Sequence, residues 1–363
     1  MTTADLKNAE LKRTPLYEVH KDSGARLIDF AGWEMPLSYS GVVDEHETVR
    51  TAAGLFDISH MGRLLFEGPK AEEGLQQLVT RDLRKLIPGS AGYSLLCNQK
   101  GGILDDIVVY KKAPDDFLVV VNASNRDKIL DWCRRHLKIQ VQDRTEAVAM
   151  LALQGPVTME ILGQQDGPKP WRLLKTRLMD QEVMLATTGY TGEPGVEIFV
   201  DASSAVRIWK GLMNRGVALG LKPVGLGARD TLRLEMGYAL YGNDIDEQTT
   251  PLEADLGWVV DFDKPNFIGK EALMAQREKG VERKLIGFRL LQPGVPRHGY
   301  KIYSNGKQIG TVTSGNMSPM LNKGIGMGYV QVAYSGVDTE ILIEKRGKII
   351  PAVVVKRPFY KKQ

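Results

Sequence analysis

Cysteine is almost absent from this chain, which has only Cys97 and Cys133 among its 363 residues. Two cysteines cannot form a disulfide framework, so the sequence is typical of a protein from a reducing compartment. Long hydrophobic runs are absent too, because stretches such as 117–121 have the length of a strand rather than of a membrane span. Residues 1–12 lack the apolar core of a signal peptide. We therefore expect a cytoplasmic protein that does not bind a membrane, or a mature organellar protein whose transit peptide has been removed.

Neither sign of charge dominates the sequence. There are 48 Lys and Arg against 44 Asp and Glu, which gives a formal net charge of +4, and the isoelectric point is about 8.8. The charges are interspersed, and no long Lys/Arg run or recognition motif indicates a nucleic-acid partner. A mildly basic surface favours an acidic protein partner or an anionic cofactor.

Several common catalytic motifs are missing. No Gly-x-Gly-x-x-Gly segment opens a helix, and neither a phosphate-binding loop nor a Gly-x-Ser-x-Gly segment occurs. The five histidines show no paired metal-ligand spacing, and neither cysteine belongs to a Cys-x-x-Cys. The sequence therefore predicts a function without a metal, a nucleotide or a redox cofactor.

Hydrophobic periodicity predicts an α+β chain with an all-β module at its C-terminus. The expected strands are 93–97, 102–111, 117–121, 148–153, 182–188 and 196–200, of which the first three form an antiparallel meander. The expected helices are one from a cap at Ser124 or Asn125 to Leu137, then 203–219, one after Pro223 with a stripe that reaches Met236, and 270–279. After Lys284, short strands and Gly/Pro turns predict a small barrel or sandwich.

Asp105 and Asp106 follow a Gly–Gly turn at the start of an expected strand. Adjacent strand residues face opposite sides, so at most one of the two acids points into a given cavity. Because Leu104 and Ile107 are apolar, one acid is expected at the edge of a core, where it needs a partner. The alternative is a turn cap that serves solubility.

Two further segments leave two interpretations open. In residues 188–198, a glycine-rich loop precedes a strand on which Glu197 alternates with apolar residues. Either the loop brings backbone close to a ligand, or Glu197 simply faces solvent. Arg229 and Arg233 share one face of an expected helix, which is either a solvated basic face or a site that binds a carboxylate.

Seven segments, in their order along the chain, resemble the glycine cleavage T-protein family. They are Asp29–Trp33, Phe56–Gly62, Gly101–Asp106, Thr188–Ile198, Ala228–Leu234, Tyr241–Asp244 and Ile309–Ser318. Together they cover almost the whole chain. By themselves, His60 and Met61 in the second segment are expected to be structural and core residues.

The resemblance implies a fold and a division into domains. The family fold is α+β, a three-domain cloverleaf around a central folate site with a C-terminal all-β barrel. Residues 1–62 with 145–265 would form a discontinuous N-terminal folate-binding domain, and 63–144 an inserted antiparallel α+β domain. Residues 266–363 would form the β-barrel domain.

The resemblance also implies a set of site residues. The family's acid at the reaction centre matches Asp106, its pterin-binding Glu matches Glu197, and its binding Arg matches Arg229. The positions near the folate are Met61, Tyr93, Asn122, Tyr190, Tyr238 and Tyr360. A carboxylate accepts the amino group and the ring N–H of a pterin as a pair, and aromatic and Met side chains suit its flat ring.

The implied activity is that of an aminomethyltransferase of the glycine cleavage system. The methylene carbon would pass from aminomethyl-dihydrolipoyl H-protein, a transient and acidic lipoylated partner, to tetrahydrofolate. The products would be 5,10-methylenetetrahydrofolate, ammonia and dihydrolipoyl H-protein, with no metal, flavin or nicotinamide involved. The alternative is a non-catalytic folate-binding protein of the iron–sulfur assembly type, whose Lys-Gly-Cys segment has no counterpart in residues 188–193. The flavin-containing sarcosine and dimethylglycine enzymes share the folate domain, but this chain has no flavin fingerprint.

Overall fold

The computed structural model describes residues 10–164, 169–345 and 347–362. Residues 1–9 and 363, at the outer ends of the predicted first and last domains, lie outside the described residues. The chain divides into two compact units. The first unit consists of Met1–Arg63, Asp143–Gly189 and Glu193–Arg229, and the second of Leu64–Gln142, Tyr190–Gly192 and Asp230–Gln363. The division into three domains stays a prediction.

The first unit is built on a six-stranded sheet with the strand order β10-β11-β12-β9-β3-β13. Its strands are β3 (Ala53–Asp57), β9 (Val148–Gln154), β10 (Leu173–Leu178), β11 (Gln181–Ala186), β12 (Gly195–Asp201) and β13 (Leu221–Pro223). All neighbours are antiparallel except β13, which is parallel to β3. β9, β11 and β12 confirm the strands expected in this part of the chain.

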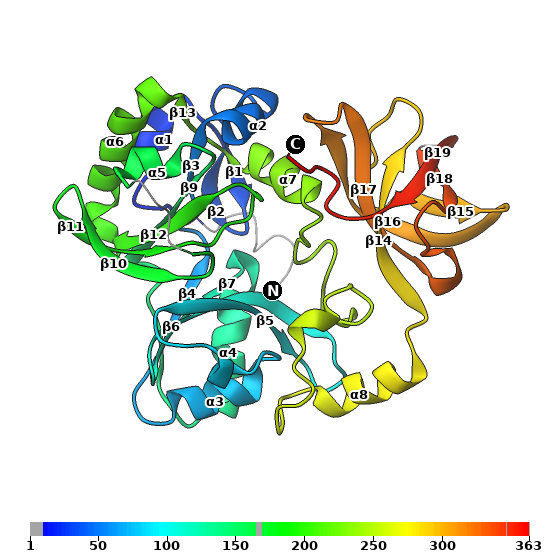
Figure 1. The fold of residues 1–363 in the computed structure, drawn as a ribbon, viewed down its shortest axis with the longest axis horizontal. Coiled ribbons are helices and arrows are strands. Elements are labelled where there is room, and N and C mark those ends of the chain that lie inside the picture. Colours follow the sequence, from blue (N-terminus) through cyan, green and yellow to red (C-terminus); the bar gives the residue numbers. More distant parts are fainter. Residues whose placement is uncertain (1–9, 165–168, 346, 363) are drawn as a thin grey trace. The chain divides into compact units, whose positions relative to one another are not determined.

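Helices cover the sheet of the first unit (Figure 1). They are α1 (Tyr17–Asp22), α2 (Val42–Thr51), α5 (Thr158–Leu162) and α6 (Ala205–Gly216), and a separate hairpin comprises β1 (Arg26–Phe30) and β2 (Trp33–Ser38). α6 is amphipathic and buries Ile208, Trp209 and Leu212 in a core shared with Leu151 and Ile198 of the sheet. Short 3-10 helices, η4 (Ala202–Ser204) and η5 (Val217–Leu219), extend α6 to the predicted length.

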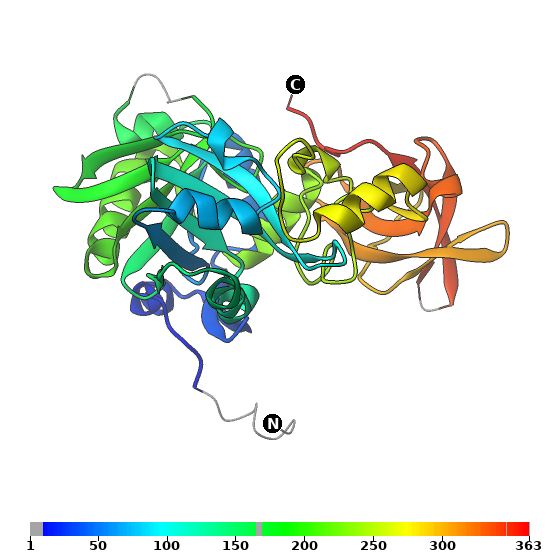
Figure 2. The same ribbon diagram turned by 90° about the horizontal axis from the view of Figure 1, so that it is seen from below.

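The second unit contains a five-stranded sheet with the order β5-β6-β7-β4-β8. Its strands are β4 (Gly62–Glu67), β5 (Ser90–Cys97), β6 (Ile103–Ala113), β7 (Asp116–Val121) and β8 (Val141–Asp143). The antiparallel pairing of β5, β6 and β7 confirms the predicted meander. Helices α3 (Ala71–Leu78) and α4 (Arg126–His136) pack on this sheet around a core that includes Leu75, Ile107 and Ile129 (Figure 2).

Two helix ends differ from the sequence-based expectation. Asn125 does precede α4, but its side chain makes no capping hydrogen bond and donates to Asp105 instead. α7 (Leu226–Glu235) ends one residue before Met236, which belonged to the predicted stripe. At Asn125 a tertiary contact takes the place of the local cap.

The C-terminal part of the second unit is a closed antiparallel barrel with the order β14-β17-β16-β15-β18-β19. Its strands are β14 (Arg283–Leu290), β15 (Lys301–Ser304), β16 (Lys307–Ser318), β17 (Lys323–Gln331), β18 (Glu340–Lys345) and β19 (Lys348–Val355). A Cβ on Gly326 would lie 2.5 Å from the ring of Phe288 on the neighbouring strand, so this glycine makes room for a core aromatic. The predicted α+β fold with a C-terminal barrel is therefore confirmed.

The remaining elements of the second unit are short. They are α8 (Lys270–Lys279), η2 (Leu83–Lys85), η3 (Ala123–Asn125), η6 (Gly257–Val259) and η7 (Val332–Tyr334). α8 ends at Gly280, as predicted. Within the described residues, every helix falls short of the length and hydrophobicity that crossing a membrane requires.

Candidate functional site

Two adjacent acids stand near the start of β6, shortly after a glycine turn. Gly101 has a φ of +82°, a left-handed conformation that favours glycine. A Cβ on Gly102 would lie 2.0 Å from the backbone oxygen of Glu247, so only a glycine permits this close approach. The turn therefore fixes where β6 begins, and with it the positions of Asp105 and Asp106.

Asp106 and Tyr93 lie on the same face of the β5–β6 pair. Tyr93 stands opposite Val108, and Leu95 stands opposite Asp106, so the two polar residues are diagonal neighbours. The Tyr93 hydroxyl donates a hydrogen bond to Asp106 Oδ2 at 3.1 Å. This contact holds the half-buried Asp106 carboxylate in one orientation.

Asp105 is completely buried. Its carboxylate accepts hydrogen bonds from the backbone N–H of Asn122 at 3.0 Å, from the Asn122 side-chain amide at 2.8 Å, and from the Asn125 amide at 2.6 Å. The Asn122 amide nitrogen also donates to Asp106 Oδ1 at 2.7 Å. Successive residues on a strand point to opposite faces, and one amide at the end of β7 nevertheless joins both carboxylates.

The environment shifts the proton affinity of this cluster. Burial raises the pKa of both Asp105 and Asp106, and repulsion from Asp106 raises the pKa of Asp105 further. Burial and then the charge of Asp106 raise the pKa of Tyr93. Two carboxylates so closely linked do not ionise independently, so the pair retains a proton at a higher pH than an exposed Asp does. Such a pair is suited to accepting a proton from a bound reactant and returning it.

The second unit contains two stacked aromatic pairs near the acids, and one of them includes Tyr93. Trp258, in η6, stacks on Tyr93 with ring centroids 6.0 Å apart, yet 68% of Trp258 remains exposed. Tyr190 stacks on Tyr238 with centroids 5.7 Å apart, and the Tyr190 hydroxyl donates to the backbone oxygen of Ala239. Besides burial and Asp106, Tyr190 contributes to the raised pKa of Tyr93, so the two aromatic pairs are close in space.

Arg233 is buried in an ion-pair network, so its interpretation as part of a solvated basic face is wrong. Its Nη1 donates to Asp244 Oδ2 at 2.9 Å, and its Nε and Nη2 donate to Asp230 Oδ1 at 2.9 and 2.7 Å. Asp244 is fully buried and also accepts from the hydroxyls of Thr313 and Ser314 on β16. Arg233 therefore ties α7 to the barrel.

Glu197 lies on β12 of the first unit and is only 7% exposed, so its interpretation as an outward-facing residue is wrong. Its neighbours Val196 and Ile198 belong to the apolar core of that unit. The Thr188 hydroxyl donates to Glu197 Oε2. A buried carboxylate requires hydrogen-bond donors, and Thr188 supplies one of them.

The glycine-rich loop before β12 is held by buried side chains. A Cβ on Gly189 would lie 2.0 Å from the side-chain oxygen of Gln154, and Gln154 Nε2 donates to the backbone oxygen of Thr188 at 3.2 Å. A buried ion pair joins Arg50 to Glu193 of the loop at 3.0 Å. These contacts give the loop that precedes Glu197 a defined shape.

Met61 and Arg229 also belong to the first unit, and both are half-buried. His60 is buried and packs edge-on against Phe30, with ring centroids 5.4 Å apart. Burial, followed by the charge of Arg229, lowers the pKa of His60 to about 3. His60 is therefore neutral at physiological pH, with the guanidinium of Arg229 nearby.

The structure brings some of the predicted site residues into direct contact. Asp106, Tyr93 and Asn122 form one hydrogen-bonded cluster, and Tyr190 pairs with Tyr238. The half-buried Tyr360, also in the second unit, donates its backbone N–H to the Glu235 oxygen at 3.2 Å. Met61, Glu197 and Arg229 belong to the first unit.

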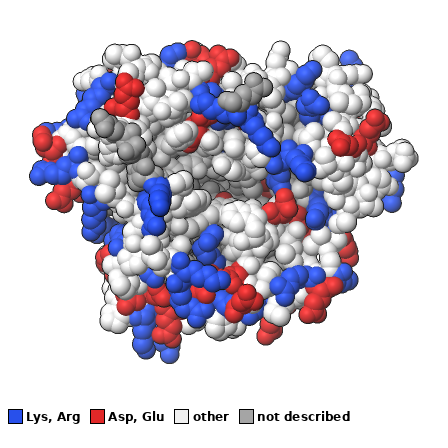
Figure 3. All heavy atoms as spheres, viewed as in Figure 1, with Lys and Arg blue, Asp and Glu red and all other residues white. Residues whose placement is uncertain are grey.

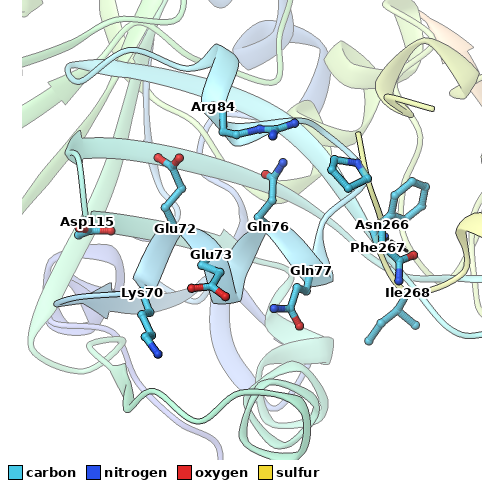
Figure 4. A pocket seen from close by; sticks show the side chains of 11 residues that line it. Lys70, Glu72, Glu73, Gln76, Gln77, Arg84, Asp115, Asn266, Phe267 and Ile268 are labelled. Carbon is cyan, nitrogen blue, oxygen red and sulfur yellow. Dashed lines mark hydrogen bonds between the residues drawn. The ribbon is translucent and has the colours of Figure 1, made fainter. Parts of the chain in front are cut away.

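A cavity of about 720 Å³ in the second unit lies elsewhere (Figure 4). Its wall consists of residues from α3 and from the segment before α8, together with Arg84 and Asp115. Charged and amide side chains point from α3 toward the opening, and none of the predicted site residues lines it. This cavity therefore does not include the site around Asp106.

Two family models match the chain in succession. The GCVT N-terminal domain matches residues 16–264, and the glycine cleavage T-protein C-terminal barrel domain matches residues 283–361. The chain belongs to the glycine cleavage T-protein family. The resemblance seen in the seven segments is thereby confirmed.

Individual members of the T-protein family are similar to this chain over nearly their whole length. The aminomethyltransferase of Halothermothrix orenii is 50% identical over 356 residues, which are 96% of this chain and 100% of that protein. That of Rubrobacter xylanophilus is 48% identical, with 97% and 95% covered. The crystal structure of the glycine cleavage system aminomethyltransferase T from Bartonella henselae matches with a TM-score of 0.90 at 37% identity, over 96% of this chain and 98% of that one.

This T-protein family member is an aminomethyltransferase of the glycine cleavage system, as predicted. The relatives favour this function over the alternative of a non-catalytic iron–sulfur assembly protein. The roles of individual residues stay predictions.

Sequence reasoning missed three residues that contact the predicted site residues or their neighbours. Trp258 is an isolated tryptophan in an irregular segment, where no periodicity marks it. Asn125 has the pattern of a helix cap and serves Asp105 instead. Asp244 stands among polar residues in the sequence, and no local pattern marks it as the buried partner of Arg233.

Proposed function

We propose that this chain transfers the methylene carbon of aminomethyl-dihydrolipoyl H-protein to tetrahydrofolate, with Asp106 at the reaction centre. The observation that carries the proposal is the fixed, half-buried Asp106 carboxylate, which accepts hydrogen bonds from Tyr93 and Asn122. In the transfer, N5 and N10 of tetrahydrofolate form bonds to the methylene carbon, while its bonds to the nitrogen of ammonia and to the sulfur of the lipoyl arm break. A carboxylate in this position stabilises the positive charge that develops during this exchange. It also accepts a proton from the incoming amine and returns one to the departing ammonia.

The remaining predicted residues would bind tetrahydrofolate. Glu197 would accept the adjacent amino group and ring N–H of the pterin, since it is a buried carboxylate with a defined neighbour, Thr188. Met61, Tyr93, Asn122, Tyr190, Tyr238, Arg229 and Tyr360 match family positions near the folate, and aromatic and Met side chains suit its flat ring. The stacked aromatic pairs support this assignment, because such rings present flat apolar surfaces.

Three finer points belong to the same proposal. We assign residues 1–62 with 145–265 to the folate-binding domain, 63–144 to the inserted domain and 266–363 to the barrel. We expect a cytoplasmic location, which agrees with the two free and buried cysteines. The independence from a metal, a flavin and a nicotinamide stays a prediction that activity in the presence of a chelator would test.

The proposed partner is a lipoylated H-protein that binds only transiently, because each turnover must release the lipoyl arm. On the face shown in Figure 3, Lys and Arg are interspersed with Asp and Glu, so no single-sign field covers it. The net charge of +4 is compatible with weak steering of an acidic partner and equally with simple solubility.

One assay tests the proposed function. The purified chain is mixed with aminomethylated H-protein, and ammonia release is measured with and without tetrahydrofolate. We expect release to depend on the folate and to produce 5,10-methylenetetrahydrofolate in equal amount. A protein that only carries folate would bind it, as calorimetry detects, without accelerating ammonia release.

A further inference from the structure

Asp105 is surrounded by hydrogen-bond donors. Its Oδ1 accepts from the side-chain amides of Asn122 and Asn125 at 2.8 and 2.6 Å, and its Oδ2 accepts from the Asn122 backbone N–H at 3.0 Å. An N–H group donates a hydrogen bond to an ionised carboxylate but cannot accept one from a protonated carboxyl. A buried carboxylate with two or three N–H donors is strongly held in its charged form. Burial and the charge of Asp106 raise the pKa of Asp105, and these contacts oppose both effects. Because all three donors match an ionised carboxylate, they favour Asp105 as the charged member of the pair.

Asp106 has a different set of partners. One N–H, from Asn122, and one hydroxyl, from Tyr93, donate to its two oxygens. The Tyr93 hydroxyl also accepts hydrogen bonds, so it tolerates a protonated Asp106 without losing its contact. Asp106 is half-buried rather than fully buried, so a proton on it is within reach of a bound molecule.

The Asn122 amide connects the two acids. Its nitrogen has two hydrogens, and it lies 2.8 Å from Asp105 Oδ1 and 2.7 Å from Asp106 Oδ1. The same nitrogen also lies 3.2 Å from the backbone oxygen of Asp106, but the two carboxylate contacts are shorter, so the amide joins both carboxylates and holds them near one another. Two like charges at that distance disfavour double ionisation, so one member of the pair takes up a proton more readily than an isolated Asp does.

We propose that Asp105 is a positioning residue that keeps its negative charge and, with Asn122, makes Asp106 the proton-accepting member of the pair. This inference rests on the proposed function in that it assigns Asp106 to the reaction centre. It adds that the proton affinity of Asp106 depends on the neighbouring Asp105 carboxylate, which would contact neither folate nor the lipoyl arm. Replacing Asp105 should therefore change how Asp106 titrates.

Other titratable groups face the pair from the elements around it. Tyr93 contacts it from β5. From the segment after α7, the charge of Asp244 adds to burial in raising the pKa of Asp106, and burial followed by the charge of Asp105 raises the pKa of Tyr241. Lys128 on α4 donates to the Tyr241 hydroxyl at 2.9 Å and pairs with Glu247 at 2.9 Å. The charge of Lys128 is thus shared with Glu247 and Tyr241, whereas the three donors of Asp105 contact it directly.

The titration of each acid can be measured on the intact protein by NMR of ¹³C-carboxyl-labelled aspartate. Asp105→Asn and Asp106→Asn assign the two resonances. We expect the Asp106 resonance of the unaltered protein to titrate at a higher pH than that of an exposed Asp, while the Asp105 resonance stays ionised over that range. In Asp105→Asn the Asp106 midpoint should fall by about 1 pH unit or more, because the neighbouring charge is gone. The acidic limb of the pH profile for ammonia release should move in the same direction.

A second variant and a control keep the test decisive if Asp105→Asn folds poorly. Asn125→Ala removes a donor from Asp105 alone, so it should also lower the Asp106 midpoint, though by less. Asp82→Asn removes another buried acid of the second unit, one that contacts Arg84 and Gln76, and should leave the midpoint unchanged.

Two results would overturn the inference. One is an Asp106 midpoint that Asp105→Asn and Asn125→Ala both leave unchanged. The other is an Asp105 resonance that titrates near neutral pH while Asp106 stays ionised. Because the NMR titrations need neither folate nor H-protein, they are independent of the proposed role of Asp106 at the reaction centre, which fails instead if Asp106→Asn still releases ammonia at the normal rate.

Discussion

Trp258 stacks on Tyr93 with ring planes inclined by 24°, and Tyr93 in turn donates to Asp106. A mostly exposed indole is thereby two contacts away from the proposed reaction centre. Indole fluorescence responds to changes in solvent exposure, so Trp258 should report the arrival of a ligand beside Tyr93.

The first prediction concerns this indole. Addition of tetrahydrofolate should change the tryptophan fluorescence of the protein, and Trp258→Phe should abolish most of the change while preserving a ring that stacks on Tyr93. Trp171, which is exposed in the other unit, supplies the control variant Trp171→Phe. A signal that Trp258→Phe leaves intact would show that the ligand does not reach this part of the second unit.

Asp106→Asn should lower folate-dependent ammonia release by about 100-fold or more, since positioned acid–base groups typically contribute at least that much. The amide is nearly isosteric with the carboxylate, so the variant should keep its fold and its thermal unfolding temperature. Stopped-flow or steady-state measurement of ammonia with H-protein checks this. Near-normal turnover in Asp106→Asn would remove Asp106 from the reaction.

Much of the fold was predictable because local patterns and tertiary structure agree. The meander around Asp106 follows from segments rich in Ile, Val and Tyr that are separated by turn-forming residues, and β5, β6 and β7 pair in that order. α6 follows from its helical stripe. In such segments the buried face is visible in the sequence itself.

The site was less predictable because its contacts join residues distant in sequence. Asn125 has the sequence pattern of a helix N-cap. Only the position of Asp105 on β6 shows that the Asn125 amide binds that carboxylate instead. Glu197 alternates with core residues as an exposed residue would, and it is buried because Thr188 and its loop cover it. A period of two tells which face a side chain takes, but not whether another segment covers that face.

Glu197→Ala should weaken the binding of tetrahydrofolate by roughly 2–3 kcal/mol, the cost of losing a paired hydrogen bond to a charged acceptor. The affinity for H-protein should change little. Calorimetric titration with each ligand separates the two effects, and Glu182→Ala, an exposed Glu on β11, serves as the control. An unaltered folate affinity would leave Glu197 as a structural partner of Thr188.

Asp57 gives the first unit a dependence on acid. Burial by itself raises the pKa of Asp57, but hydrogen bonds from His20, Thr14 and Ser59 outweigh it and lower that pKa to about 2. An unfolded Asp titrates near 3.9, so the folded state is favoured above that pH and loses the advantage as pH falls from about 4 to about 2. The expected loss is roughly 2–3 kcal/mol.

The acid dependence can be measured by urea unfolding at pH 6, 4 and 3. Asp57→Asn should be less stable than the unaltered protein at pH 6 and should show a flatter decline toward pH 3. Asp29→Asn, at a carboxylate that contacts only a backbone N–H in an exposed turn, is the control and should keep the steep decline. Equal slopes in both variants would assign the acid sensitivity to other carboxylates.

The last prediction concerns the encounter with H-protein. If the net positive charge of this chain steers an acidic lipoyl carrier, the Michaelis constant for H-protein should rise with salt, because exposed charges are screened beyond about 8 Å at physiological ionic strength. The affinity for free tetrahydrofolate should respond less, since the proposed contacts at Glu197 and Asp106 are shielded from solvent to a greater degree. Kinetics at low and high salt, with H-protein as the varied substrate, and folate titrations at the same salt concentrations distinguish the two responses. If the Michaelis constant for H-protein does not change with salt, the net charge serves solubility rather than steering. Recognition of H-protein would then depend on shape and on the reach of the lipoyl arm.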